Sequence, residues 1–270
     1  MSQARIYRLF VDSLVDRSIS SGETPQNFTV QLPKSIVPDI KDVHVLSCVF
    51  PNLIPTFSQY NNTFSFRNAT AGINYSISLA SLFWATGTDF ATYLQGQMNA
   101  STPGFTVTYS LATGKLTTVN SLIGFQIFNN TTATIKCQKK VGFYGNGAGN
   151  NPSTAVGVPL TASGMLNLLG TTSVYLVSNN LCPGQSLTGN NLSSSPVQFN
   201  VLLKIPVLVS AYQLNSYTNT FYDLKYDVVD GQYRDLHFAI LDDNYDPIVF
   251  GGDNCGFQLH LEISYTESRF

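Results

Sequence analysis

Charge is scarce in this sequence. Lys, Arg, Asp and Glu together make up 11% of the 270 residues, and the formal net charge is -2. A protein that binds nucleic acid draws most of its affinity from Lys and Arg side chains that neutralise phosphates. Because the chain has no basic stripe of this kind, we expect no direct, sequence-specific binding of nucleic acid.

Long apolar runs are missing as well. No window approaches the roughly 20 apolar residues that a membrane-spanning helix requires. The opening stretch, MSQARIYRLFVDSL, has no apolar run of signal-peptide length and no small-residue cleavage site. We therefore expect a protein that does not span a membrane and is not secreted.

The sequence also lacks the usual signatures of metal, redox and catalytic sites. Its cysteines stand singly, without CxxC spacing, and are expected to be free thiols: Cys48, Cys137, Cys182 and Cys255. There is no GxSxG elbow, and the carboxylates lie mostly in turns. The glycine-rich GNGAGNN has neither the Lys nor the following helix of a phosphate loop. These absences predict a protein that is not an enzyme and needs no cofactor.

Alternating apolar and polar residues recur along most of the chain. In residues 27–32, for example, Phe28, Val30 and Leu32 share one face, as in a half-buried strand. The same pattern predicts strands at 42–50, 63–67, 75–79, 105–109, 115–119, 173–178, 197–209, 236–241 and 256–265. Pro, Gly, Asn or Ser bound most of these runs, and aromatic residues reach 12% of the chain. The sequence therefore predicts an all-β protein.

Three other segments add detail. Gly114 in LATGKL supplies the positive φ of a hairpin over 105–119, and a cap at Thr88 or Asp89 predicts one short helix through Asn99. Residues 144–195 contain flexible, uncharged loops typical of an elaboration on a domain. About ten strands and a single helix favour a β-sandwich or jelly roll, with two antiparallel sheets.

The stretch DDNYD has two interpretations. Asp242, Asn244 and Asp246 occupy the first, third and fifth positions of a calcium loop, and Asp253 would be the twelfth. Pro247, however, stands where that loop needs glycine, and strands rather than helices flank it. We therefore favour a hairpin turn, in which Asp, Asn and Pro are usual residues, and keep the three residues as the alternative metal ligands.

Two further groups were considered as binding sites. His237 and His260 both lie at polar positions of alternating strands, so a cross-strand pair is one reading, although no third metal ligand accompanies them. The aromatic residues near the Asn61–Asn62 dipeptide could form a ligand platform or simply fill the space between sheets: Phe57, Tyr60, Phe64 and Phe66.

Several stretches in this order resemble the single jelly-roll capsid proteins of large icosahedral double-stranded DNA viruses, virophages and related elements, in particular their penton, or vertex, proteins. They span nearly the whole chain: QNFTVQLP, FPNLIPTFSQYNNTFSF, YSISL, DFATYLQGQMN, FTVTYSLATGKLTTV, VGFYG, SVYLVSNNL, LHFAILDDNYDPIVFGG and FQLHLEISY.

The resemblance implies a single jelly-roll domain over 26–270, elaborated around 144–195, and an N-terminal arm over 1–25 that reaches neighbouring subunits. It implies a homopentamer at the five-fold vertices of a virion, beside a double jelly-roll major capsid protein and minor capsid proteins. Within the arm, aromatic and arginine side chains are the interface candidates, because such residues are enriched at interface centres: Tyr7, Phe10 and Arg17.

Two other functions stay open at this stage. The chain could be a minor capsid protein or a spike- or fibre-like sandwich that binds a receptor or carbohydrate through Phe57 and Tyr60. It could also be a metal-assisted hydrolase that uses Asp242, Asp246 and His260.

Overall fold

The computed structural model describes residues 3–16, 24–32, 40–128, 131–144, 151–179, 181, 186–189, 197–219, 226–227, 235–250 and 255–267. The chain forms two compact units. Unit 1 combines Met1–Ile54 with Thr171–Phe270, and unit 2 comprises Pro55–Gly170. Unit 2 is thus inserted into the sequence of unit 1.

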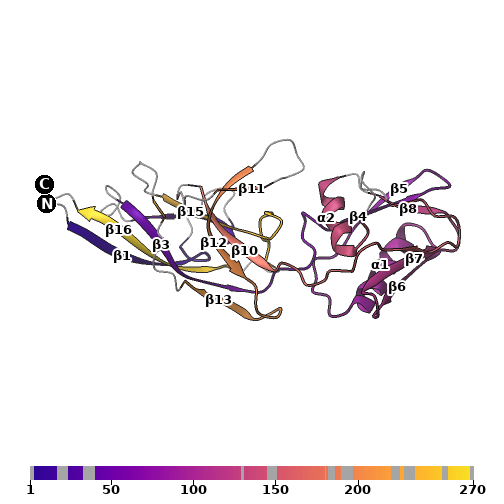
Figure 1. Cartoon of the computed structure of the whole chain (residues 1–270), viewed down its shortest axis with the longest axis horizontal. Coiled ribbons are helices and arrows are strands. Elements are labelled where there is room, and N and C mark those ends of the chain that lie inside the picture. Colours follow the sequence, from indigo (N-terminus) through magenta and orange to yellow (C-terminus); the bar gives the residue numbers. More distant parts are fainter. Residues whose placement is uncertain are drawn as a thin grey trace. The chain divides into compact units, whose positions relative to one another are not determined.

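Unit 1 consists of two antiparallel sheets (Figure 1). The first sheet has the order β1-β16-β3-β13, and its strands are β1 (Gln3–Asp12), β16 (Gln258–Glu267), β3 (Ile40–Pro51) and β13 (Leu214–Thr218), with β14 (Tyr226–Asp227) also paired to β3. The second sheet has the order β11-β12-β10-β15-β2, and its strands are β11 (Ser186–Gly189), β12 (Val197–Pro206), β10 (Ser173–Ser178), β15 (Asp235–Leu241) and β2 (Asn27–Gln31).

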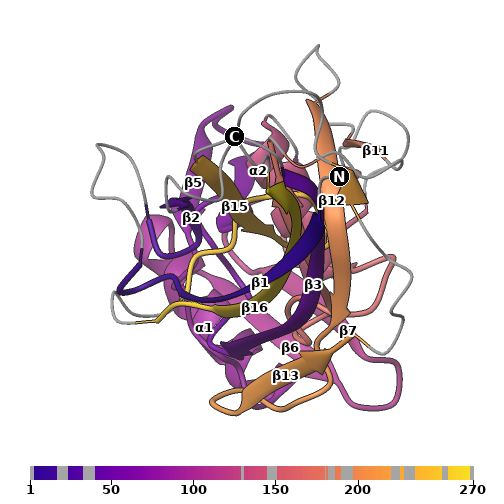
Figure 2. The same ribbon diagram turned by 90° about the vertical axis from the view of Figure 1, so that its left-hand side faces the viewer.

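The strand order of unit 1 is that of an eight-stranded jelly roll. Leaving aside the short β11 and β14, the first, eighth, third and sixth strands along the chain form one sheet. The second, seventh, fourth and fifth form the other. Successive strands therefore change layers at every step except from β10 to β12, which pair within the second sheet, as in the two Greek keys of a jelly roll. The expected fold class is confirmed, and Figure 2 shows β1, β16, β3 and β13 in one layer.

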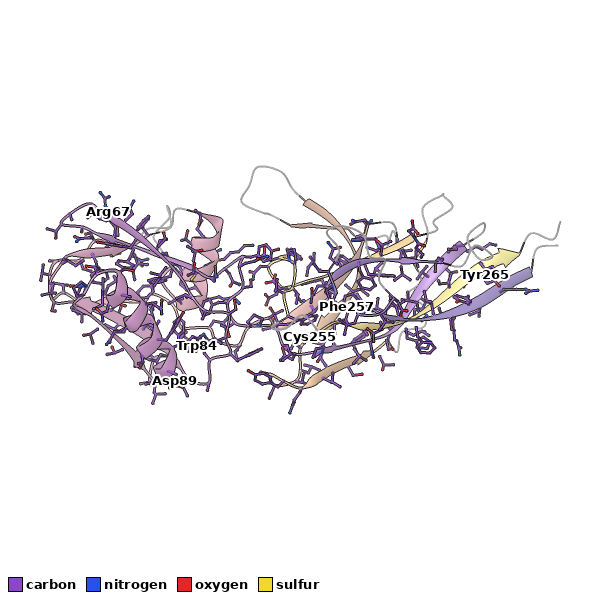
Figure 3. The ribbon with its side chains drawn as sticks, turned by 180° about the vertical axis from the view of Figure 1, so that it is seen from behind. Arg67, Trp84, Asp89, Cys255, Phe257 and Tyr265 are labelled. Atoms are coloured by element: carbon purple, nitrogen blue, oxygen red, sulfur yellow. The ribbon has the colours of Figure 1, made fainter. Side chains whose placement is uncertain are left out.

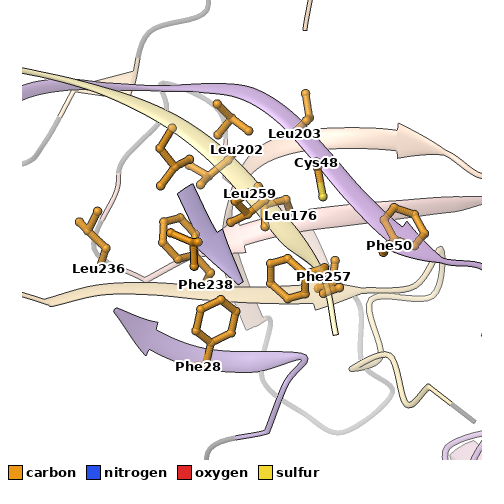
Figure 4. Packing of buried hydrophobic residues seen from close by; sticks show 14 of the residues in the cluster. Phe28, Cys48, Phe50, Leu176, Leu202, Leu203, Leu236, Phe238, Phe257 and Leu259 are labelled. Carbon is orange, nitrogen blue, oxygen red and sulfur yellow. The ribbon is translucent and has the colours of Figure 1, made fainter. Parts of the chain in front are cut away.

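Apolar side chains from alternate positions fill the space between the two sheets of unit 1. Phe28 of β2 packs against Phe238 of β15 and against Phe257, with ring centroids 6.1 and 5.1 Å apart (Figure 4). From β16, the predicted inward residues Leu259 and Leu261 are buried in the same cluster. The period-two pattern of the sequence thus builds this core directly.

Unit 2 has its own core. It contains two three-stranded sheets: β5 (Asn74–Ser78), β4 (Thr63–Asn68) and β8 (Phe125–Ile127) form one, and β6 (Phe105–Ser110), β7 (Lys115–Asn120) and β9 (Leu160–Thr161) form the other. Helices α1 (Gly87–Ser101) and α2 (Thr132–Val141) complete it. Phe66, Phe90 and Phe125 are among its fully buried aromatic side chains.

The predicted hairpin and the predicted helix are both present, but the helix begins at a different capping residue. Strands β6 and β7 pair as predicted, and Gly114 has φ 66°. The cap of α1 is Thr86 rather than Thr88 or Asp89: its hydroxyl accepts a hydrogen bond from the Asp89 N–H at 3.1 Å. Helix α2 was not predicted, so the described residues hold two helices instead of one.

The domain boundaries differ from those expected. Residues 3–12 are not a separate arm, because β1 pairs with β16 along its whole length. The inserted segment is Pro55–Gly170, rather than a loop region around 144–195. Residues 173–178 and 197–206, which lie beyond Gly170, are strands of the jelly roll itself.

Candidate subunit interface

Strand β1 is the terminal strand of the first sheet, and its outward face carries two exposed apolar side chains on either side of Arg8. Because side chains alternate across a strand, Tyr7 and Leu9 pack partly buried against the core, while Ile6 and Phe10 point outward. Phe10 is 71% exposed and Ile6 is 64% exposed. In the turn that follows, Leu14 and Val15 are exposed as well. We call these four outward residues the β1 surface.

The three interface candidates from the sequence have different positions in the structure. Phe10 lies at the surface, as an interface residue should, whereas Tyr7 faces the core and is only partly exposed. Arg17 lies outside the described residues. Sequence reasoning missed Ile6, because one exposed aliphatic residue in an alternating strand carries no distinctive signal.

Phe10 borders a hollow on the outer side of the first sheet. Its ring stacks on the ring of His260, directly opposite on β16, with centroids 4.0 Å apart and planes inclined by 14°. The hollow has a volume of about 400 Å³ and is lined by Phe10, Val11, Asp12, Asp16, Ser47, Val49, Gln258, Leu259 and His260. The Nε2 atom of His260 is buried and has no hydrogen-bond partner among the described residues.

The acidic side of this hollow is held in place by hydrogen bonds. Asp12 accepts from the backbone N–H of Leu14 at 2.9 Å and from the side-chain amide of Gln258 at 2.9 Å. Asp16 accepts from the backbone N–H of Asp12 at 2.7 Å. These contacts form a local Asx-type turn. The hollow therefore combines a fixed aromatic wall with two positioned carboxylates.

A second exposed apolar group lies at the other end of the strand order. Leu208, Tyr212 and Leu214, at the start of β13 and in the loop before it, are 82%, 75% and 67% exposed. We call these three residues the β13 surface. Because β1 and β13 end the path β1-β16-β3-β13, the two apolar surfaces lie on opposite margins of the same sheet.

The loop that carries the β13 surface is tied to Asn52. The side-chain amide of Asn52 donates to the carbonyl oxygen of Val209 at 2.8 Å, and its backbone N–H donates to the carbonyl oxygen of Gln213 at 2.8 Å. The N–H of Tyr212 donates in return to the carbonyl oxygen of Asn52 at 3.0 Å. Tyr212 itself has φ 68°, a left-handed conformation that is uncommon for a bulky residue.

The DDNYD stretch forms the favoured turn. The Asp242 carboxylate accepts from the backbone N–H groups of Asn244 and Asp246 at 2.8 and 2.9 Å, and Tyr245 has φ 60°. Burial raises the pKa of Asp242, and the nearby Asp246 carboxylate raises it further, while the two backbone donors lower it. Its oxygen is therefore engaged with the turn's own backbone. Asp253 lies outside the described residues.

The structure contradicts two further hypotheses from the sequence, the histidine pair and the aromatic ligand platform. His237 lies on β15 of the second sheet and His260 on β16 of the first, so they are not a cross-strand pair. The ligand platform is wrong because Phe57, Phe64 and Phe66 are fully buried in the core of unit 2. In the described part of the chain, no three His, Cys, Asp or Glu side chains group as a metal site would require.

Three cysteines are described, and all are free thiols, as expected. Burial raises the pKa of Cys48 to about 12, and burial also raises the pKa of Cys137, against a small opposing effect of Lys140. Cys255 is partly exposed. Cys182 lies outside the described residues.

A weak ion pair lies on the exposed face of the first sheet. Arg8 Nε lies 3.3 Å from Glu262 Oε2, and exposed ion pairs of this kind contribute little to the stability of the fold.

Among the described residues, none of the helices has the length and apolar character needed to cross a bilayer.

Two solved structures are similar to this chain. One is the crystal structure of the selenomethionine-labelled mavirus penton protein, with 9% identity and a TM-score of 0.46 over 97% of this chain and 99% of that one. The other is a chain of the Sputnik virophage determined by cryo-electron microscopy at 3.5 Å, with 13% identity and a TM-score of 0.42 over 97% of both chains. No family model matches the sequence, and no curated protein matches it.

Proposed function

We propose that this chain is a structural subunit of a viral capsid, which assembles as a homopentamer at the five-fold vertices of an icosahedral virion. The observation that carries the proposal is the placement of exposed apolar side chains on both margins of one sheet. A closed ring is built from heterologous contacts, in which two different patches of each copy meet. The β1 surface and the β13 surface are two such patches.

The jelly-roll fold and the sequence stretches that resemble penton proteins support a role in a capsid. Jelly rolls are a common architecture of viral capsid proteins, although they also occur in lectins and cupins. The ordered stretches from QNFTVQLP to FQLHLEISY resemble penton proteins in particular. The low net charge of -2 limits repulsion when many copies crowd together. Neighbouring double jelly-roll and minor capsid proteins belong to the same proposal.

The composition of the two surfaces fits contact with protein rather than water. Interface centres are enriched in aromatic residues and depleted in Lys, Glu and Asp. Phe10 and Tyr212 are the most exposed aromatic side chains on these surfaces, and Leu208 and Ile6 are exposed beside them. Exposed apolar groups of this kind on a soluble protein mark an interaction site.

The mass of the purified chain tests the proposal. Native mass spectrometry should give a species of five times 29.5 kDa, because a closed ring satisfies both surfaces of every copy and the resemblance to penton proteins implies five copies. Electron microscopy of the same sample should show rings with five-fold symmetry. A chain that stays monomeric at high concentration, also in the presence of the major capsid protein, would contradict the proposal.

A further inference from the structure

Tyr212 has the features of a preorganised anchor. Its ring is 75% exposed, yet its backbone is held by the hydrogen bonds that join the loop to Asn52. A left-handed conformation costs a bulky L-residue of order 1–3 kcal/mol, and such strain persists where the surrounding structure fixes it, often at functional sites. The fold thus presents this aromatic side chain at a defined position without the entropy loss of ordering a mobile loop.

The hollow beside β1 has a complementary lining. The Phe10 ring and Val49 supply the apolar wall, and the Asp12 and Asp16 carboxylates supply polar groups. Aromatic rings pack favourably in offset or edge-to-face pairs, and a buried tyrosine hydroxyl usually finds a hydrogen-bond partner. A phenol side chain therefore matches both parts of this lining, and about 400 Å³ is ample for it.

The sheet register places the two features at the same end of the strands. Asp12 lies opposite Gln258, Gln258 opposite Val49, and Val49 opposite Ser216, so one row crosses the sheet from the hollow to β13. Leu214, two residues before Ser216, pairs with Pro51, and Tyr212 comes just before it in the chain. A neighbouring copy could therefore bring one feature against the other without a large shift along the strands.

We infer that Tyr212 of one copy inserts into the hollow lined by Phe10 and His260 of the next copy, and that this contact closes the ring. The inference rests on the proposed homo-oligomer and specifies its contact. The occupant of the hollow is a second copy because this chain itself carries a matching aromatic knob on the opposite margin of the sheet. Repeating the contact in one direction around the ring uses every knob and every hollow.

A double-mutant cycle tests the contact. Tyr212→Gly removes the ring but accepts the left-handed backbone, and Phe10→Ala removes the wall of the hollow. Each should weaken association, measured by analytical ultracentrifugation, by about 30-fold or more, as expected for an interface anchor. The double variant should lose clearly less than the product of the two single losses, because the residues share one contact. Leu111→Ala, at an 87% exposed site of unit 2, is the matched control and should associate as the unaltered chain does.

Cysteine cross-linking gives an independent readout. In a Tyr212→Cys, Gln258→Cys double variant that also carries Cys255→Ser, oxidation should produce a ladder of covalent multimers on a denaturing gel, whereas neither cysteine introduced alone into the Cys255→Ser chain should do so. A ring that forms normally but shows neither the coupling nor the ladder overturns this contact and leaves the proposed function standing. An unaltered chain that is monomeric overturns both.

Discussion

Replacing Phe28 by alanine tests whether the two units have separate cores. Phe28 is fully buried in unit 1 and contacts the rings of Phe238 and Phe257. Truncating a buried phenylalanine to alanine costs about 3–5 kcal/mol, through lost burial and the cavity left behind. With a urea dependence of about 2 kcal/mol per M, the unfolding midpoint of unit 1 should fall by roughly 2 M.

The single tryptophan allows the two units to be followed separately. Trp84, labelled in Figure 3, belongs to unit 2. It packs against Phe90 and Tyr93 with ring centroids 5.4 and 4.6 Å away. Its fluorescence therefore reports the unfolding of unit 2, whereas far-ultraviolet circular dichroism reports both units. In the Phe28→Ala variant, an early dichroism transition should appear while the fluorescence transition keeps its midpoint.

The matched variant for unit 2 is Phe66→Ala, which removes a fully buried ring that stacks on Tyr75. It should move the Trp84 transition and spare the transition of unit 1. The reasoning is refuted if Phe28→Ala shifts the Trp84 fluorescence as far as the dichroism, since that result would mean that the two clusters unfold as one cooperative body.

Three further changes have defined outcomes. Gly142→Ala should lower the stability of unit 2 in the Trp84 assay by about 1–3 kcal/mol, because Gly142 caps α2 at φ 89° and a Cβ would lie 2.5 Å from the carbonyl oxygen of Gly164. Burial raises the pKa of Asp242 above 3.8, so its contribution to stability is present below that pH and is lost as the pH rises through the folded value. Asp242→Asn removes this loss, and its stability relative to the unaltered chain should therefore rise as the pH increases from below 3.8 through the folded pKa of Asp242, in urea unfolding followed by circular dichroism; a gap independent of pH would refute the assignment. Thiol labelling of the native protein at about pH 8, read by peptide mass spectrometry, should reach Cys255 well before Cys48, whose pKa of about 12 leaves about one thiolate in 10⁴; equal rates would contradict the burial of Cys48.

Local pattern was sufficient to predict most strands of the jelly roll. The segments 27–32, 173–178 and 236–241 were predicted within one residue of β2, β10 and β15. In these strands the apolar residues of one face enter the core, so the period-two signal and the burial have the same cause. The DDNYD turn was predicted for a similar reason, because the Asp242 carboxylate accepts hydrogen bonds from its near neighbours Asn244 and Asp246.

The resemblance implies an arm over 1–25, and the residues of β1 do not contradict it because their pattern does not alternate. Tyr7 and Leu9 face the core, but Ile6 and Phe10 on the outer face are also apolar. A strand with apolar residues on both faces cannot be distinguished from an irregular segment by periodicity alone. The residues that hide the strand in the sequence are thus the same ones that make its outer face a candidate interface.

The extent of unit 2 could not be predicted, because strand partnership is not a local property. The run at 63–67 looks as strand-like as the run at 27–32, yet β4 joins β5 and β8 while β2 joins β15. Pairing between segments far apart in sequence leaves no mark on either segment by itself. Helix α2 was missed because its capping box pairs two threonines, Thr131 and Thr134, whereas the usual sequence signal has Glu or Gln at the second position.

The contacts at the two ends of unit 2 explain how a jelly roll accommodates so long an insertion between β3 and β10. The Thr56 hydroxyl donates to the carbonyl oxygen of Leu168 at 3.2 Å, and Lys140 Nζ donates to the carbonyl oxygen of Thr56 at 2.8 Å. The entry and exit of unit 2 are therefore held together by its own residues. For a flexible connection the entropy of closing the loop grows with its length, but a folded insertion whose ends already meet behaves as a short connection. The sheets of unit 1 can thus pair as if the intervening segment were only a few residues long, which leaves unit 2 free to vary in sequence without disturbing the jelly roll.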